Sequence, residues 1–466
     1  MTAHRRNRVL IRGATVVVLI VAVLAGLRLM GWIAPAGPRP IVILIMADTL
    51  RADHVGFLGY EHDTTPNLDR FAADAMTFEN CYSHAPETRS SCGSVLTGFL
   101  PHETRVPEFR QLPGMHETLA EILKSVGYQT AAVVSNYVLR KGYGFEQGFD
   151  VYDDTMDDFE AVRQSPERTA ARTTDRAIEL LRQRGDKPMF LWVFYQDPHG
   201  PYTPPGEFSK MFIDPDRKPR LLEVNDSISG RGAIPSYQRL GEHRDYHYYV
   251  SQYNGEIRYF DKHVGRLIEA IRKMGLYDDA LIIFTSDHGE GMGERDYYFA
   301  HGENLYDYQL HVPLVIRHGR KFIGRRSDDV QHIDLLPTIL RTLGLTPNPL
   351  YRGRDLRRPD PPGADIFALM NSWELHNEVQ FSLIRDGLKM IYFPRENRYD
   401  LFDLRKQPRE TRNLFADAIY QQRARELSAR LAKTIADDRL QLRVVMRDVA
   451  LTEEQKRNMQ SLGYTK

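Results

Sequence analysis

The stretch from Pro40 to Ala47 reads PIVILIMA, a continuous apolar run rich in β-branched side chains. Such a run is typical of a strand that is buried on both faces, as in parallel sheets. Similar short runs recur further along the chain, at Tyr128–Ser135, Met189–Tyr195, Ala280–Ser286 and Val312–Arg317.

Helical patterns lie between these runs, with apolar residues at intervals of three or four. They cover Thr65–Met76, His116–Val126, Arg168–Arg184, Tyr248–Met274 and Ile333–Leu343. Strands that alternate with helices predict an α/β fold, here a three-layer α/β/α sandwich around a mostly parallel central sheet. In such a fold the chemistry gathers at the carboxyl ends of the strands.

The pattern changes after Gly353. Short strand-like runs separated by turn signals predict a small antiparallel sheet, and a long charged helix is expected from Tyr420 to Asp437. We therefore expect a catalytic domain over residues 41–350 and a C-terminal α+β subdomain with a helical tail over residues 351–466.

The N-terminus predicts a membrane anchor. A basic tail of residues 1–13, with four arginines, precedes an apolar segment over 14–34, and a Pro-rich linker over 35–40 follows. A span needs roughly 20 apolar residues, and this segment reaches that length if Arg28 extends toward the interface. The positive flank places the tail in the cytoplasm, so we expect a single-pass protein of the cytoplasmic membrane with its catalytic part outside. A cleaved signal peptide is the alternative.

Composition excludes some classes of function. Lys+Arg and Asp+Glu both number 62 in the 466 residues, so nothing indicates a polyanion-binding surface and no nucleic-acid partner is expected. Only Cys81 and Cys92 occur, which is too few for a Cys-rich zinc site or a disulfide framework. The two cysteines could form a disulfide bond with each other or remain free thiols. The sequence also leaves the oligomeric state open.

Acidic residues follow two of the expected strands. Asp48 comes directly after the first run, and Asp287 and His288 follow the run that ends at Ser286. Buried carboxylates are costly unless a charge neutralises them, and a divalent cation does so with carboxylate and imidazole ligands. These three residues are therefore candidate metal ligands. An Asp after a strand can also be a helix N-cap, which is the alternative for Asp48.

The ordered set of motifs resembles the sulfatase-like family of the alkaline-phosphatase superfamily from about Ile41 to the C-terminus. The matching pieces are Asp48–His54 with Gly59-Tyr60, Thr65–Asp69, Ser286–Glu290, Leu305–Asp307, His311–Leu314, Asp334–Thr338 and Phe402–Leu404 with Asn413-Leu414. The resemblance implies the sandwich fold, a metal-dependent ester hydrolase and a sulfate- or phosphate-ester substrate.

The same resemblance identifies Thr88 as the nucleophile and as a fourth metal ligand. In sulfatases the cysteine that becomes formylglycine lies ten residues before the glycine of a Leu-Thr-Gly, and here Gly98 sets that register. Thr88 replaces the cysteine and Cys92 replaces the usual arginine, so no formylglycine is expected. We expect a helix to begin near Ser90, with free amides beside Thr88 that favour an anionic ester.

Further site residues follow from the resemblance. His199 and His301 are expected to bind the ester oxygens or protonate the leaving group, or to hold a second metal. Asn136 stands where sulfatases carry a Lys-x-His pair, and Arg89 follows the nucleophile, so both are candidate substrate contacts. The metal is one divalent ion, with zinc, manganese and calcium all open.

Three functions are compatible with these residues. The main expectation is a hydrolase of sulfuric or phosphoric esters. Attack at phosphorus suits a threonine nucleophile, because a threonine ester cannot expel sulfate by elimination, whereas the family favours sulfate. The alternatives are a phospho-alcohol transferase acting on envelope lipid or glycan, and a catalytically silent member used for binding.

Overall fold

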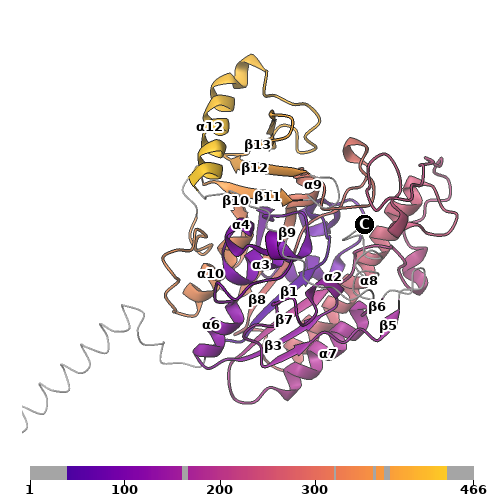
Figure 1. Ribbon diagram of the computed structural model, residues 1–466. Helices are drawn as coiled ribbons and strands as arrows, with labels where there is room; N and C mark the ends of the chain where they lie inside the picture. Colours follow the sequence, from indigo (N-terminus) through magenta and orange to yellow (C-terminus); the bar gives the residue numbers. More distant parts are fainter. Residues whose placement is uncertain (1–38, 160–165, 320–321, 360–363, 372–377, 438–466) are drawn as a thin grey trace, which may run out of the picture.

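A computed structural model describes residues 39–159, 166–319, 322–359, 364–371 and 378–437 (Figure 1). Its centre is an eight-stranded sheet with the strand order β10-β2-β9-β8-β1-β7-β3-β4. The strands are β1 (Val42–Ala47), β2 (Met76–Tyr82), β3 (Gln129–Val134), β4 (Val151–Asp153), β7 (Met189–Tyr195), β8 (Leu281–Ser286), β9 (His311–His318) and β10 (Gly324–Gln331).

Five adjacent strands of this sheet, from β8 to β4, run parallel to one another. β9 runs antiparallel to both of its neighbours, β8 and β2, and β10 pairs parallel with β2. The predicted mostly parallel sheet is confirmed, and the five apolar runs correspond to β1, β3, β7, β8 and β9.

Alternate residues of the central strands face opposite layers. Ile43 and Ile45 of β1 pack in one core with helices α2 (Pro66–Ala72), α7 (Ala170–Gln183) and α8 (Tyr246–Lys273). Val42, Leu44 and Met46 pack in the other core with α3 (Thr88–Thr97), α6 (Leu119–Ser125) and α10 (Leu335–Thr342). This arrangement is the predicted three-layer sandwich.

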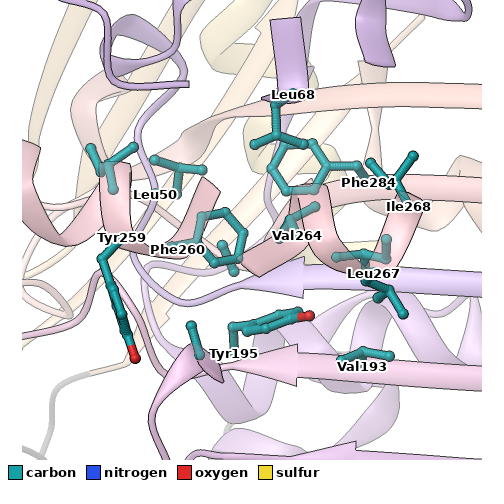
Figure 2. Close-up of a cluster of buried hydrophobic side chains, with 14 of the residues drawn as sticks. Leu50, Leu68, Val193, Tyr195, Tyr259, Phe260, Val264, Leu267, Ile268 and Phe284 are labelled. Atoms are coloured by element: carbon teal, nitrogen blue, oxygen red, sulfur yellow. The ribbon is translucent and has the colours of Figure 1, made fainter. Parts of the chain in front are cut away.

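The long helix α8 supplies much of the first core. Figure 2 shows Phe260, Val264 and Leu267 of α8 beside Val193 and Tyr195 of β7. Each such buried apolar side chain contributes about 1.5–3 kcal/mol relative to exposure. The packing holds the carboxyl ends of the central strands in a rigid frame.

A second, antiparallel sheet follows the large one and confirms the small C-terminal sheet that the sequence predicted. It consists of β11 (Ile366–Asn371), β12 (Val379–Arg385), β13 (Leu388–Phe393) and β14 (Arg398–Asp403). Helix α12 (Gln421–Asp437) covers one face through residues such as Leu427 and Leu431. The other face packs on Tyr306 and on Leu310 of the single-turn helix α9 (Asp307–Leu310). The small sheet therefore lies directly against the large domain (Figure 1).

The remaining elements are short. They include α4 (Pro101–Thr104), α5 (Val106–Phe109), and a two-stranded sheet of β5 (Asp158–Phe159) and β6 (Pro166–Glu167). Cys81 and Cys92 are both buried and free. Within the described ranges no helix has the length and apolarity to cross a bilayer. The predicted anchor over 14–34 and the basic tail lie outside those ranges.

Candidate functional site

Three predicted metal ligands meet at the carboxyl ends of β1 and β8. These strands are parallel neighbours with Ala47 opposite Ser286, so the residues that follow them emerge side by side. The backbone N–H of Asp287 donates to the carbonyl of Ala47 over 3.1 Å, which extends the pairing by one residue. Asp48, Asp287 and His288 each place one potential ligand atom within 4.8 Å of the others, and all three are fully buried.

The carboxylates of this cluster fit a divalent cation. Oδ1 of Asp48 and Oδ2 of Asp287 have no hydrogen-bond partner among the described residues. His288 Nε2 lies 3.5 Å from Asp287 Oδ2 and 4.0 Å from Asp48 Oδ1. Burial and then repulsion from Asp287 raise the pKa of Asp48, and burial raises the pKa of Asp287. Two buried oxygens and one imidazole nitrogen that converge in this way match the ligand set of a metal ion.

Hydrogen bonds orient each ligand. His288 Nδ1 donates to the carbonyl of Gly289 over 2.9 Å, and burial lowers the pKa of His288, so Nε2 presents its lone pair to the cluster. Asp287 Oδ1 accepts the backbone N–H groups of Thr49 (3.1 Å) and His288 (2.7 Å). One oxygen of Asp287 is therefore fixed by the backbone and the other faces the cluster.

Thr88 lies beside these ligands. Its Oγ1 is 3.4 Å from Nε2 of His288, and its side chain also offsets a small part of the rise in the pKa of Asp287 that burial causes. The residue is fully buried as the first residue of α3. The structure thus brings the hydroxyl predicted as nucleophile to the three predicted metal ligands.

The expected start of this helix was wrong. α3 begins at Thr88, not near Ser90, because Glu87 is its N-cap. The Glu87 carboxylate accepts the backbone N–H groups of Arg89 (3.1 Å) and Ser90 (2.9 Å). The amides that the sequence offered to an anionic ester are therefore already bonded within the protein. Glutamate is not among the residues favoured at N-caps, so the sequence carried no signal for this contact.

Two further histidines complete the cluster. The ring of His301 lies 4.6 Å from that of His288 and 5.1 Å from that of His199, centroid to centroid. His199 Nδ1 donates to the carbonyl of Gly200 over 2.7 Å, which orients that ring. Among the described residues, no second group of three acidic, cysteine or histidine side chains converges as closely as the first.

His301 is paired with a buried carboxylate. Its Nδ1 lies 3.2 Å from Oε1 of Glu290, whose Oε2 accepts the hydroxyl of Tyr202 over 3.1 Å. Burial alone would lower the pKa of His301, but the attraction of Glu290 outweighs it and the pKa is raised. A protonated imidazole here suits an anionic substrate. The structure therefore shows Glu290 supporting His301.

The two remaining candidates have other contacts in the structure. Asn136, just after β3, donates from its side-chain amide to Oδ2 of Asp48, so it orients a candidate metal ligand. The Arg89 guanidinium donates to the carbonyl of Arg110 and lies 5.4 Å from the ring centre of Tyr143. The sequence could not predict the contact of Asn136 with Asp48 or the contacts of Arg89.

The comparison with protein families decides the identity. The sequence profile of the protein family that is described as Sulfatase matches residues 40–345 of this chain. The chain belongs to the sulfatase family. It is therefore an ester hydrolase of the sulfatase and alkaline-phosphatase superfamily, and the predicted resemblance is confirmed. Members of the sulfatase family use a metal ion, and Asp48, Asp287 and His288 are the residues that could hold it here.

Relatives of this sulfatase-family protein include both sulfate- and phosphonate-ester hydrolases. The N-acetylglucosamine-6-O-sulfatase of Bacteroides thetaiotaomicron is 24% identical, over 85% of this chain and 86% of that protein. The structure of BT4656 with its substrate D-glucosamine-2-N,6-O-disulfate has a TM-score of 0.72 at 20% identity, covering 88% of this chain and 100% of that one. The phosphonate monoester hydrolase of Agrobacterium radiobacter has a TM-score of 0.67 at 21% identity, covering 86% and 96%. The two structural likenesses show the shared fold.

Proposed function

We propose that this sulfatase-family protein is a metal-dependent hydrolase of sulfuric or phosphoric esters that uses the unmodified hydroxyl of Thr88 as its nucleophile. The observation that carries the proposal is the position of Thr88 Oγ1, 3.4 Å from Nε2 of His288 in the buried cluster with Asp48 and Asp287. A threonine in a core without such a cluster would have no means of activation.

The ligand set bears on the cofactor. A bound divalent cation would lower the pKa of a hydroxyl that it touches and offset the negative charge of the ester. The imidazole of His288 makes zinc or manganese a better match than it would be for an all-oxygen site, and calcium is the third candidate. Formylglycine is not part of this proposal, because position 88 carries threonine.

The residues of the chain then have distinct roles. Thr88 Oγ1 attacks sulfur or phosphorus, and its proton passes to the buried carboxylate of Asp287 in the same cluster. His301, whose pKa is raised by the neighbouring Glu290, stabilises the ester oxygens, and His199 protonates the departing alcohol. In the second step His199, now neutral, takes a proton from water, which attacks the threonine ester at sulfur or phosphorus. Asp287 returns its proton to Oγ1 of Thr88 as the sulfate or phosphate leaves.

Two features bear on the ester class. Elimination from a formylglycine hydrate is closed to threonine, so the second step is direct attack of water at sulfur or phosphorus, and phosphorus accepts such attack more readily. The named activities of the relatives cover sulfate esters and phosphonate esters. We therefore keep both sulfuric and phosphoric esters as substrates.

The decisive experiment compares Thr88→Ala and Thr88→Ser with the wild type. Aryl sulfate, aryl phosphate, aryl phosphodiester and aryl phosphonate esters are assayed after metal removal and reloading with zinc, manganese or calcium. We expect Thr88→Ala to lose at least about 10³-fold in kcat and Thr88→Ser to retain part of it. Thr97→Ala is the matched control, because that buried hydroxyl bonds the carbonyl of Gly93 at the far end of α3. Wild-type rates in Thr88→Ala would remove Thr88 from the mechanism.

We also propose, from the basic tail and the apolar segment over 14–34, that the protein is anchored in the cytoplasmic membrane and acts on its outer side. A reporter enzyme that is active only outside the cytoplasm, fused after residue 466, would be active under this proposal. An inactive reporter with an active cytoplasmic counterpart would reject it.

A further inference from the structure

The single-turn helix α9 touches both loops that carry the site histidines. The carbonyl of Gln309 accepts the backbone N–H of Gly289 over 2.8 Å, and its side-chain Oε1 accepts the backbone N–H of Gly302 over 2.9 Å. Gly289 directly follows His288, and Gly302 directly follows His301. One residue therefore ties together two turns of the long segment that connects β8 to α9.

The approach of these loops to α9 is close. A Cβ atom at Gly289 would lie 2.1 Å from the carbonyl oxygen of Tyr308, so no larger residue fits without displacing α9. Gln309 is fully buried, and its Nε2 has no hydrogen-bond partner among the described residues. Among the described residues, the hydrogen bond of its side chain is therefore the one that Oε1 accepts from Gly302.

The opposite side of α9 is fixed to the C-terminal sheet. Glu410 Oε2 accepts the backbone N–H of Asp307, the first residue of α9, over 2.6 Å. Lys389 of β13 lies between the two carboxylates, with Nζ 3.0 Å from Glu410 Oε1 and 3.4 Å from Asp307 Oδ1. Lys389 is fully buried and Glu410 nearly so. Buried charges that are paired in this way have little freedom to move, so α9 has a rigid base.

We propose that Gln309 is a positioning residue of the active site, which sets the distance between His301 and His288 through its bond to Gly302, on a helix anchored by Lys389 and Glu410. This inference rests on the proposed function, because it assumes that His288 binds metal and that His301 contacts the ester. It adds a role for the C-terminal sheet, which contributes no residue to the cluster yet supports its geometry.

The test separates the side-chain bond from the backbone bond of Gln309. Gln309→Met keeps the size and the backbone bond to Gly289 but removes the acceptor for Gly302. Gln309→Glu keeps that acceptor and loses no bond, because Nε2 has none. Gln252→Met is the matched control, since Gln252 is also buried and donates to the carbonyl of Ser209.

Three readouts are measured on the full chain: kcat and KM, the dissociation constant for zinc, and hydrogen exchange at the Gly302 amide. In Gln309→Met we expect kcat to fall about tenfold or more, since small displacements of catalytic groups have such effects. Zinc affinity stays within about twofold, because the backbone bond behind His288 persists. The Gly302 amide exchanges faster, and Gln309→Glu restores both kcat and protection.

Two results would overturn the inference. One is wild-type kcat and wild-type exchange at Gly302 in Gln309→Met. The other is a lower kcat in Gln309→Met with unchanged exchange at Gly302, which would indicate packing and not the hydrogen bond. Thr88→Ala is assayed in parallel, and full activity of that variant would reject Thr88 as the nucleophile and with it the proposed function. Hydrogen exchange at the Gly302 amide needs no turnover, so it tests the role of Gln309 separately.

Discussion

The side-chain amide of Asn136 donates a hydrogen bond to Oδ2 of Asp48, and both residues are fully buried. This bond leaves Oδ1 of Asp48 free to face the other two candidate metal ligands, Asp287 and His288. We predict that Asn136→Leu weakens metal binding about 10- to 100-fold, the usual effect of losing a bond that orients a ligand. Titration calorimetry with zinc and manganese measures it. Ser135→Ala is the control, because Ser135 contacts Thr173 instead; equal affinities in all three proteins would contradict the prediction.

A side chain at Gly200 would require the neighbouring side chain of Gln238 to move. A Cβ atom there would lie 2.0 Å from both Nε2 and Oε1 of the buried Gln238, next to His199. We predict that Gly200→Ala displaces His199 and lowers kcat/KM about 100-fold, with metal content unchanged. Steady-state kinetics and metal analysis check this. Gly185→Ala, where only Gln129 lies within 4 Å at 3.8 Å, should behave as wild type.

Lys389 holds two buried carboxylates, those of Asp307 and Glu410. Lys389→Met leaves them without a counter-charge, so we predict a loss of about 3–5 kcal/mol in the free energy of unfolding, measured by urea denaturation. Adding Glu410→Gln should recover part of the loss, because it removes one uncompensated charge. The exposed Lys406, 3.3 Å from Asp403, is the control, and Lys406→Met should leave the urea midpoint unchanged.

We predict that the buried His84 makes the stability of the folded protein sensitive to acid. Burial lowers its pKa from 6.5 to about 4; Nδ1 donates to the carbonyl of Phe367 over 2.6 Å, and Nε2 accepts the N–H of Ile333 over 3.4 Å. Below pH 6.5 the unfolded chain binds a proton that the folded protein does not bind until about pH 4. Stability contributed by this residue is therefore lost as pH falls through that window, by at most about 3 kcal/mol.

Urea denaturation between pH 7 and pH 4 measures this effect. The wild type should lose stability more steeply than His84→Gln, which keeps a donor and an acceptor but does not titrate. Parallel pH profiles for the two proteins would show that His84 plays no part in acid unfolding.

The large sheet could be predicted where strands are buried on both faces. β1, β7 and β8 lie in the middle of the sheet, so every position is buried and almost every one is apolar; the polar exceptions are Thr285 and Ser286 at the end of β8. β10 reads GRRSDDVQ because it is an edge strand with exposed positions, and no apolar pattern marks it. α9 has four residues, too few to show a helical period.

The candidate site likewise has a part that the sequence could predict and a part that it could not. Asp48, Asp287 and His288 could be predicted to meet, because each directly follows a central strand. The pairing of Glu87 with the first amides of α3, and of Asn136 with Asp48, could not, since these contacts depend on side-chain directions fixed only in the folded chain. The family resemblance identified Thr88 as the position of the nucleophile, and the structure showed that Thr88 lies close to His288.

The contacts between the two sheets have a practical consequence for anyone shortening this protein. A fragment ending at residue 350 would strip Asp307 of Lys389 and Glu410 and leave His84 without its carbonyl partner on β11. It would also open the apolar side of Leu310 to water. Such a fragment is a poor candidate for expression, whereas removal of the N-terminal segment alone leaves every one of these contacts intact.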